Sequence, residues 1–459
     1  MTVSLLPITI VPIKMFQSNE YRIQISHSLL KYWNIDIDRP LIITIGINRV
    51  EAIIEGAAIM KEEIKLSENI FQEFSLPIQE NRLLASYSNK DSTVTFGPII
   101  GLLTELNDQE EGPDFRSVHT FCEELHDMIS NIGGFFFVFQ LKDWTEGKLN
   151  GFCFQNEQWQ KTPVPLPDVI YNRIHSRKLE ASPSFQKFKT DIASWNIPIF
   201  NDQFLSKEKV HQYLYSEEHM QPYLPETVAI TEADFQMMIK KYPSLYIKPI
   251  HGSQGRNIIR ISKINKKLLA EMSTGMGEEN TRLFDDYTRF YQWFKPYLKN
   301  RTFLAQASIP LMTYKNRPLD FRILCHKNFR DSWKATSAIA RISADQQFVS
   351  NIARGGEMMK PFNILAILSN RNTAIQQLAL MKELAVEVAS IISQRAEGLI
   401  GELGIDIGVD QNGKLWIIEV NAKPSKNFEG QDKKIRPSAK ALIEYCTFLA
   451  FSNVTIKEE

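Results

Sequence analysis

The chain has 459 residues, which is long enough for about three domains. Lys and Arg number 53, and Asp and Glu also number 53, so the formal net charge is zero. This balance argues against a general nucleic-acid or anionic-membrane binder, because such proteins carry clustered positive charge. No apolar run approaches the roughly 18 residues that a membrane span needs. The widely spaced cysteines indicate free thiols in a reducing cytosol; they are Cys122, Cys153, Cys325 and Cys446.

The first hundred residues contain a weak internal repeat. Residues 23–35 align with residues 64–76, and in each copy an apolar strand runs into a serine that is typical of a helix N-cap. Apolar strands are expected to follow at 41–46 and 92–97. Two similar β-rich halves predict a small barrel with approximate twofold symmetry, in a domain spanning 1–96. We find no catalytic set there and expect a structural or docking role.

The pattern changes after residue 97 to alternating strands and helices. Strands are predicted at 99–103, 135–139, 169–171 and 197–200, with helices over 117–132 and 184–195. This order favours an α/β domain over 97–201 with a mostly parallel sheet. Asn172, Arg173 and Arg177 follow the third strand, and ligands of open α/β sheets collect outside the carboxyl ends of strands. These residues are candidates for binding an anionic substrate, and a surface ion-pair cluster is the alternative.

Residues 404–424 carry the most informative pattern. Two apolar, alternating runs flank Asn412-Gly413, a dipeptide that favours a two-residue type I′ hairpin loop. With that loop, Asp406 lies directly across from Glu419, where two carboxylates repel each other. Asn421 points to the same face, two residues further along the strand. A hard cation such as magnesium would remove the repulsion and use all three oxygens, whereas an ordinary surface hairpin is the alternative.

A second segment, residues 246–261, joins two strands through a glycine loop. The first strand carries Lys248, and the loop reads Gly252-Ser253-Gln254-Gly255. A strand, a glycine loop and a strand can lie over phosphates with backbone N–H groups turned inward. The loop is neither a P-loop nor a dinucleotide fingerprint, because it lacks G-K-S/T and G-x-G-x-x-G. A plain turn is the alternative.

Together these segments resemble the ATP-grasp fold, in which a strand lysine and a glycine loop precede D-(x)12-E-x-N. The resemblance covers residues 201 to about 450. Lys207 resembles the family's first lysine, with Lys209 as the alternative. Residues 303–311 resemble the hinge that holds adenine, which implies that Gln306 bonds the adenine amino edge and Ile309 packs on the ring.

The resemblance also implies roles around the phosphates. Lys207 and Lys248 would neutralise the α- and β-phosphates of ATP beneath the glycine loop. Arg322 and Arg341 would be catalytic and stabilise the transferring phosphate. The metal ligands would be Asp406, Glu419 and Asn421, holding Mg2+ or, alternatively, Mn2+. The loop formed by Asn351, Gly355 and Gly356 resembles N-x-x-x-G-G and would complete the metal or substrate side.

A closer resemblance covers nearly the whole chain. The phrases F-G-P-I-I-G, P-D-V-I-Y-N-R-I and E-L-G-I-D-I-G-V-D are similar to the YheC/YheD group, endospore coat-associated ATP-grasp proteins of spore-forming bacteria. The fold expected is α/β: a β-rich domain, a small pre-ATP-grasp domain over 97–201, and an ATP-grasp domain over 202–459. The resemblance supplies no substrate.

The function implied is an ATP- and magnesium-dependent ligase that joins a carboxylate to an amine or thiol through an acyl phosphate. Its location would be cytoplasmic or associated with the spore coat, with spore-coat proteins as candidate partners and no nucleic-acid or membrane partner. The alternative is a non-catalytic ATP-binding or coat-assembly protein. A protein-kinase-like transferase is disfavoured, because no H-R-D loop or D-F-G triplet occurs.

Overall fold

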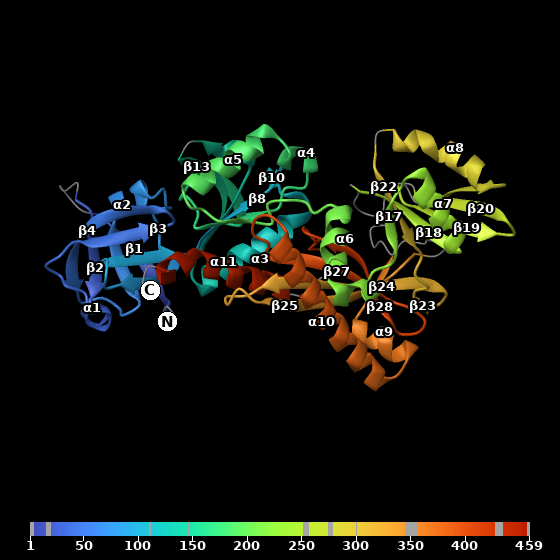
Figure 1. Cartoon of the computed structure of the whole chain (residues 1–459). Coiled ribbons are helices and arrows are strands. Elements are labelled where there is room, and N and C mark those ends of the chain that lie inside the picture. Colours follow the sequence, from blue (N-terminus) through green and yellow to red (C-terminus); the bar gives the residue numbers. More distant parts are fainter. Residues whose placement is uncertain are drawn as a thin grey trace.

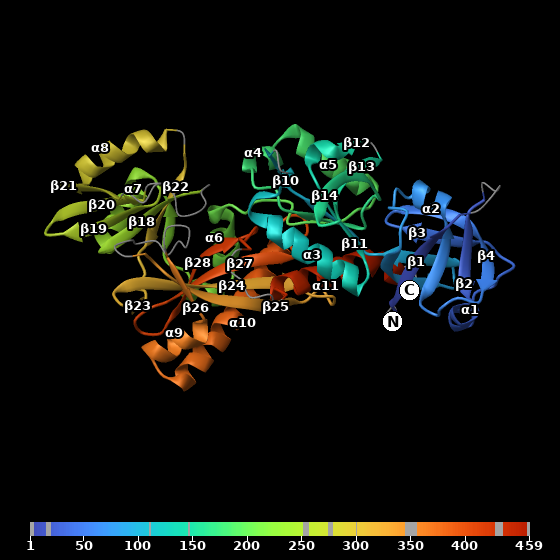
Figure 2. The same cartoon turned by 180° about the vertical axis from the view of Figure 1, so that it is seen from behind.

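The computed structural model describes residues 4–14, 20–109, 112–145, 147–250, 257–273, 279–299, 301–344, 356–426 and 435–456. These residues form a closed barrel, a central α/β unit and two further sheets. Figure 1 shows the barrel (blue) at one end of the molecule and the central unit (cyan to green) in the middle. The sheet that contains residues near 250 (yellow-green) lies at the other end, and the reverse view in Figure 2 shows the same order.

The N-terminal barrel has the strand order β1-β5-β2-β4-β3-β7-β6 and closes where β1 pairs with β6. Its elements are β1 (Leu6–Ile13), β2 (Arg22–Ser26), α1 (His27–Trp33), β3 (Leu41–Ile45), β4 (Asn48–Ala57), β5 (Glu63–Ser67), α2 (Glu68–Glu73), β6 (Asn81–Ser88) and β7 (Thr93–Gly97). Alternate apolar residues point into the barrel, so each strand has one buried face.

The internal repeat is visible in the barrel. β2 and β5 end on Ser26 and Ser67, each at the N-cap position of a short helix. The two strands pair antiparallel, with Ile23 opposite Leu66 and Ile25 opposite Ile64. Because Ile23 corresponds to Ile64 and Ile25 to Leu66 in the repeat, a twofold axis through the middle of this pairing relates the two copies. The predicted barrel is therefore confirmed.

The central unit has the sheet order β12-β13-β11-β8-β15-β16. Its elements are β8 (Ile99–Leu103), β9 (Asn107–Gln109), β10 (Gly112–Asp114), η1 (Arg116–Val118), α3 (His119–Ile132), β11 (Phe135–Phe139), η2 (Leu141–Asp143), β12 (Trp144–Thr145), β13 (Lys148–Gln155), β14 (Gln158–Val164), β15 (Val169–Asn172), α4 (Arg177–Glu180), α5 (Pro183–Ser194) and β16 (Ile199–Phe200). β11, β8, β15 and β16 are parallel neighbours, which confirms the predicted parallel sheet.

The antiparallel strands β13 and β14 were not predicted. Asn156 and Glu157 connect them and both have positive φ, so the type I′ hairpin lies here without any glycine. The strands alternate apolar and polar residues weakly, and β14 contains a proline at position 163. Weak alternation and a strand proline remove the usual strand signal.

Helix α11 (Pro437–Ile456) packs on the central unit. Leu442 and Ile443 belong to the same buried cluster as Phe121 and Leu125 of α3. The sequence-based boundaries place the end of the chain in the ATP-grasp domain, whereas the packing of α11 crosses that boundary. A helix at the end of the chain thus completes the core of a domain that begins near residue 97.

The sheet at the far end, called here the β18 sheet, has the order β17-β22-β18-β19-β20-β21. Its elements are β17 (Thr227–Ala229), α7 (Glu232–Lys241), β18 (Ser244–Pro249), β19 (Ile259–Ile264), β20 (Lys267–Ser273), β21 (Glu279–Phe284), α8 (Tyr287–Leu298) and β22 (Phe303–Ala307). Phe235 of α7 and Phe290 of α8 pack into its core.

The remaining sheet, called here the β27 sheet, has the order β26-β25-β24-β27-β28, with β23 beside β24. Its elements are α6 (Lys207–Tyr215), η3 (Glu218–Tyr223), β23 (Thr313–Tyr314), β24 (Arg317–Lys327), β25 (Trp333–Ile342), β26 (Glu357–Met359), α9 (Pro361–Leu368), α10 (Arg371–Arg395), β27 (Glu402–Val409) and β28 (Leu415–Asn421). Every residue of β27 is buried.

The β27–β28 hairpin confirms one part of the sequence interpretation and corrects another. Asp406 pairs with Glu419, as predicted. The predicted two-residue loop is wrong, because Asp410 N–H donates to Lys414 O and the loop has three residues. Gly413 has φ +83°, whereas Asn412 is absent from the described residues with positive φ. A bulge after Asp406 offsets the extra loop residue and restores the predicted pairing.

Asp410 explains the longer loop. Its Oδ1 accepts N–H groups from Asn412 at 2.9 Å and Lys414 at 3.0 Å, and its Oδ2 accepts Trp416 Nε1–H at 2.9 Å. A short acidic side chain that bonds the following backbone favours this turn over the tighter type I′ loop.

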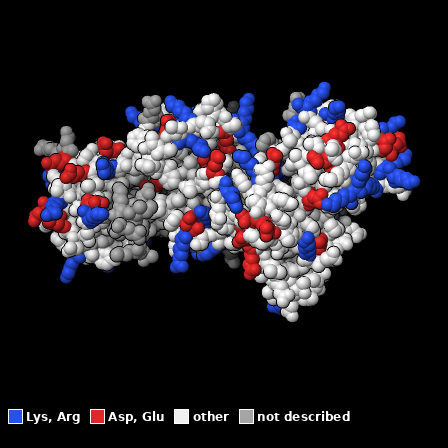
Figure 3. Space-filling model, in the orientation of Figure 1, with Lys and Arg blue, Asp and Glu red and all other residues white. Residues whose placement is uncertain are grey.

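The four cysteines are free and buried, as expected from their spacing. No helix within the described ranges is long and apolar enough to cross a membrane. On the face shown in Figure 3, basic and acidic side chains are interspersed, and the projection that carries α9 shows few charges.

Candidate functional site

A small cavity lies between the β18 sheet and the β27 sheet. Lys248 of β18 and Gln306 of β22 line it from one side, and Ile418 and Glu419 of β28 line it from the other. Lys207 lines it from the first turn of α6. This space between the two sheets, called the cleft below, brings together four of the positions singled out in the sequence.

Lys207 lies within hydrogen-bonding distance of Glu419. The Ser206 hydroxyl caps α6 by accepting Lys209 N–H, and Lys207 begins the helix. Its Nζ donates to Glu419 Oε1 at 2.7 Å. Lys209, the alternative first lysine, instead lines a separate cavity with Lys299. Lys207 is therefore the lysine of this pair that belongs to the cleft.

Lys248 is held against the predicted adenine hinge. Its Nζ donates to Gln306 Oε1 at 2.5 Å, and Gln306 Nε2 donates to Thr227 Oγ1 at 3.1 Å. Burial and the nearby charge of Lys207 lower the pKa of Lys248 to about 8. Ile309 follows β22 in the connection to Leu311, to which it is joined by a backbone hydrogen bond.

Asp406 is 3% exposed and is held by two arginines. Arg322, directly opposite on β24, donates from Nε and a terminal nitrogen at 2.7 and 2.8 Å. Arg341 contacts Asp406 at 2.9 Å and donates bidentately to Asp320 at 2.6 and 2.8 Å. Burial opposes ionisation of Asp406, but the two guanidinium groups outweigh it and lower its pKa to about 2.

Asp406, Glu419 and Asn421 present oxygen donors on one face of the hairpin, because they occupy paired or alternate positions. The described residues contain no cluster of three or more His, Cys, Asp and Glu able to hold a metal ion. The predicted set has two carboxylates and one amide, and magnesium commonly combines such a pair with substrate phosphates. Asn421 Nδ2 is buried without a hydrogen-bond acceptor, which a phosphate oxygen can supply. The residues present therefore fit a magnesium–phosphate group.

Asn172 and Arg173 lie at the junction between the central unit and the β27 sheet. Arg173 is 2% exposed; its guanidinium lies 3.4 Å from Glu402 Oε2 and donates to Pro424 O at 2.9 Å. Asn172 Nδ2 donates to Glu180 Oε1 at 2.6 Å. Both side chains therefore bond to other protein groups. This agrees with the alternative of an ion-pair cluster, except that the cluster is buried and does not lie on the surface. Their role in binding substrate stays a prediction.

Glu402 is the centre of this junction and was missed by the sequence analysis. It is 0% exposed and contacts the other four members of what we call the junction cluster. Tyr171 donates to it at 2.5 Å, His326 Nε2 lies 3.0 Å away, and Lys426 also pairs with it. A second carboxylate in a buried strand, four residues before Asp406, is the signal that could have identified it. The junction cluster comprises Tyr171, Arg173, His326, Glu402 and Lys426.

Two further basic residues lie between the junction and the cleft. Arg177 stacks on Phe204 with 4.4 Å between the guanidinium carbon and the ring centroid. Burial lowers the pKa of Arg177, and the nearby carboxylates of Glu180 and Glu419 oppose that shift. Lys423 donates to Ile174 O at 3.0 Å, and burial lowers its pKa to about 8. Lys423 was also missed, although its position in N-A-K-P, two residues after Asn421, marks it.

The remaining predicted positions are only partly covered by the structure. Gly252, Ser253, Gln254 and Gly255 lie outside the described residues, and so do Asn351 and Gly355. Gly356 is half-buried immediately before β26, whose Met358 pairs with Arg341. Their predicted roles stay predictions.

The family model described as YheC/D-like ATP-grasp matches residues 196–449. The endospore coat-associated protein YheD of Bacillus subtilis (strain 168) is 29% identical over 372 residues, covering 80% of this chain and 81% of that protein. The endospore coat-associated protein YheC of the same strain is 24% identical over 279 residues, covering 58% and 73%.

Solved ATP-grasp ligases are remotely similar to the chain. The D-alanine–D-alanine ligase from Coxiella burnetii is 11% identical and covers 78% of this chain and 97% of its own, with a TM-score of 0.43. The ligase PsnB, solved with a minimal precursor, is 12% identical and covers 76% and 98%, with a TM-score of 0.40. The assignment of the fold rests on the family model, which confirms the resemblance found in the sequence.

Proposed function

Because the chain belongs to the YheC/D-like ATP-grasp family, we propose that it binds ATP and magnesium in the cleft and uses them to activate a carboxylate. The observation that carries this proposal is the convergence of Lys207, Lys248, Gln306 and the Asp406–Glu419 pair at one place. These residues come from two sheets and from segments up to 212 positions apart in the sequence. Nothing in the packing of either sheet requires that convergence.

Each residue has a task that follows from its chemistry. Lys207 and Lys248 supply point charges for the phosphates, and Gln306 offers an amide to the adenine edge. Asp406, Glu419 and Asn421 would hold magnesium, which when bound offsets the negative charge of the terminal phosphates. Lys207 would exchange its present contact with Glu419 for phosphate oxygens.

Arg322 and Arg341 are the candidates for stabilising the transferred phosphoryl group. Their planar, bidentate hydrogen-bonding groups already hold a carboxylate, and two oxygens of a phosphoryl group can accept hydrogen bonds from the same fork. A substrate carboxylate oxygen would attack the γ-phosphorus as the bond to ADP breaks. An amine or thiol would then attack the acyl carbon, lose its proton and displace phosphate.

A second candidate function is a coat-assembly role in which the nucleotide is bound without turnover. The specific observation in its favour is that both curated relatives are described as endospore coat-associated. The closed N-terminal barrel, in which the sequence shows no catalytic set, is the part of the chain that would serve assembly.

Thermal denaturation with MgATP tests the site. Ligand that binds only the folded state stabilises it by about 2.7 kcal/mol at a concentration one hundred times its Kd, so Tm should rise. Glu419→Gln should abolish the magnesium-dependent part of this rise. Glu387→Gln, which removes an exposed carboxylate beside His219, is the matched control and should behave as wild type. An equal shift in all three proteins would reject Glu419 as a metal ligand.

Hydroxylamine trapping separates the two candidate functions. An activated carboxylate reacts with hydroxylamine to form a hydroxamate, so a mixture of amino acids and short peptides can be screened with MgATP. A hydroxamate formed by wild type and not by Glu419→Gln would establish acyl activation. A magnesium-dependent Tm shift without hydroxamate would favour the coat-assembly role.

A further inference from the structure

A second cavity, of about 790 Å³, lies in the central unit outside the carboxyl ends of β8 and β11. Residues that follow β8, residues that follow β11, and the helices α4 and α5 that follow β15 line it. These three strands are parallel neighbours, and such edges are where open α/β sheets collect ligands. The volume is within the usual range for a small-molecule site.

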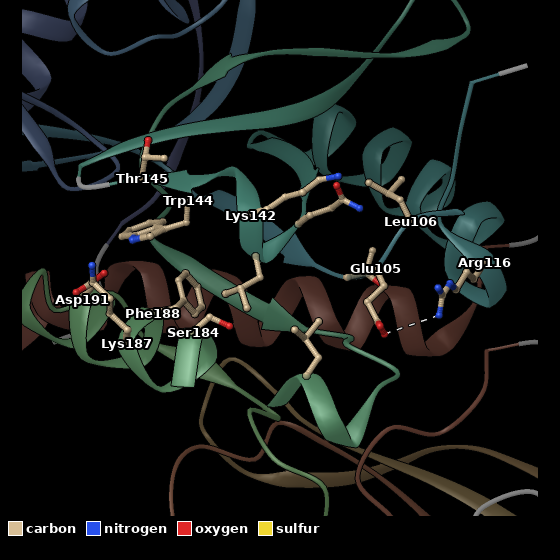
Figure 4. Close-up of a pocket in the computed structure, with 14 residues that line it drawn as sticks. Glu105, Leu106, Arg116, Lys142, Trp144, Thr145, Ser184, Lys187, Phe188 and Asp191 are labelled. Carbon is tan, nitrogen blue, oxygen red and sulfur yellow. Dashed lines mark ion pairs between the residues drawn. The ribbon is translucent and has the colours of Figure 1, made fainter. Parts of the chain in front are cut away.

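One end of this cavity is apolar and shaped by two aromatic rings. Trp144 and Phe188 meet edge to face, with ring centroids 5.3 Å apart and an interplanar angle of 83°. Leu141 and Leu179 continue the apolar lining. Figure 4 shows Trp144 and Phe188 together at one end and Glu105 with Arg116 at the other. The cavity therefore suits an elongated molecule with an aromatic or branched apolar body.

Of the two acidic groups in the lining, Glu105 already has partners. Glu105 Oε2 accepts backbone N–H groups of His175 and Ser176 at 2.8 and 2.9 Å, and Arg116 lies 3.9 Å from it. Asp191 lies beside Lys187, one helical turn away on α5, as Figure 4 shows. Glu105 is therefore poorly suited to recruit a cationic ligand, and Asp191 lies at the opposite end of the cavity from it.

The donors of the lining are in excess. Lys142 is exposed, and no carboxylate of the described residues lies within ion-pair distance of it. Two residues further on, Trp144 is 9% exposed and its Nε1–H is buried without an acceptor. A buried donor without a partner costs free energy that an acceptor on a ligand would recover. Lys142, the uncommitted cation of the lining, matches a single carboxylate and not a multiply charged nucleotide.

We propose that this cavity binds a small amphipathic carboxylate, with its apolar body against Trp144 and Phe188 and its charge beside Lys142. The site is independent of the ATP cleft, which lies between two other sheets. The proposal goes beyond nucleotide binding and carboxylate activation, and it holds or fails without them.

Fluorescence of 1-anilinonaphthalene-8-sulfonate on the full chain tests the site. This probe combines an aromatic body with one negative charge, so it should bind saturably and gain fluorescence. 3-Phenylpropionate should displace it, and 3-phenylpropanol, which has the same body without charge, should displace it about tenfold less well. Equal displacement by both compounds would overturn the role given to Lys142.

Charge-reversal variants locate the binding. Lys142→Glu should weaken the binding of 3-phenylpropionate by about tenfold. Tm should be unchanged, because Lys142 is exposed. Lys148→Glu makes the same change on an exposed lysine of the adjacent strand and should have no effect. An equal loss of affinity in both variants would mean that only the general surface charge affects binding, and it would overturn the site.

Saturating MgATP distinguishes this proposal from the proposed function. Probe fluorescence that persists in MgATP, while Tm rises, places the two ligands at separate sites. Displacement of the probe by MgATP would place it in the cleft and overturn the second site. No saturable fluorescence at all would do the same, whatever the outcome of the nucleotide titration.

Discussion

Glu402 and Asp406 lie four residues apart on β27, on the same face of the strand, and both are buried. Each has a basic or ionisable partner directly opposite on β24, His326 for Glu402 and Arg322 for Asp406. Their surroundings nevertheless differ. Glu402 is contacted by residues of the central unit, whereas Asp406 is held by Arg322 and Arg341 of the β27 sheet.

A buried acid thus acquires its role from the element that packs against it. Tyr171 and Arg173 reach Glu402 from β15 and the residue after it, so this carboxylate joins two units of the fold. The charged partners of Asp406 are Arg322 and Arg341 of its own sheet, and Lys248 of the cleft is close enough for Asp406 to oppose the lowering of its pKa. Glu402 therefore joins two units of the fold, and the role of Asp406 in binding a ligand stays a prediction.

Glu402→Gln should produce the largest loss of stability. It leaves the buried charges of Arg173 and Lys426 without their carboxylate, and breaking a buried ion pair in this way costs about 3–5 kcal/mol. The free energy of unfolding from urea denaturation measures this cost. The folded fraction should still show the MgATP-dependent rise in Tm.

Asp406→Asn is the matched variant and should reverse the pattern. Arg341 keeps its two bonds to Asp320, so we expect a smaller cost of about 1–3 kcal/mol. The MgATP-dependent shift should be lost. If Glu402→Gln and Asp406→Asn lost the same stability and retained nucleotide binding equally, the distinction between the two ends of β27 would be removed.

The pH dependence of nucleotide binding should be set by Lys248. Its pKa is lowered to about 8, so the charge that attracts phosphate is lost as pH rises through that value. We expect MgATP affinity to fall by about tenfold between pH 8 and pH 9.5, measured by calorimetry. Lys248→Arg stays charged and should show a flat profile. A wild-type affinity that is constant over this range would contradict the assignment.

Lys248 should also affect the free energy of unfolding in the absence of ligand. Between its folded pKa and the ordinary value of 10.5, the unfolded chain binds more protons than the folded chain at this site. The free energy of unfolding should therefore gain a positive slope with pH over this window. Lys248→Met should remove that contribution, in denaturation curves recorded at each pH.

Gly413→Ala should have the smallest effect, about 1 kcal/mol, because a side chain at φ +83° is strained. Its Cβ would lie 3.3 Å from Gln377 Nε2, the end of a flexible side chain that can move. Asn412→Val is the control and should be almost neutral in the three-residue loop. A type I′ loop would give a large loss for Asn412→Val, so the urea midpoints of the two variants decide between the loops.

Several features were predictable because they depend on near neighbours in sequence. The barrel follows from two similar segments whose strands end on Ser26 and Ser67, and the pairing of Asp406 with Glu419 follows from one hairpin. Even there, the loop prediction failed because the side chain of Asp410 competes for the backbone. The bulge that restores the pairing has no local signal that alternation could reveal.

The family, the barrel and the residue types gathered in the cleft can be read from the sequence, since periodicity and motif spacing act over short stretches. Only the tertiary structure decided that Arg173 pairs with Glu402, 229 positions away, and that α11 completes the core of the central unit. It also decided that Asp406 is shared by Arg322 and Arg341. These choices depend on which surfaces meet on folding, because burial strengthens an ion pair only when both partners leave water together.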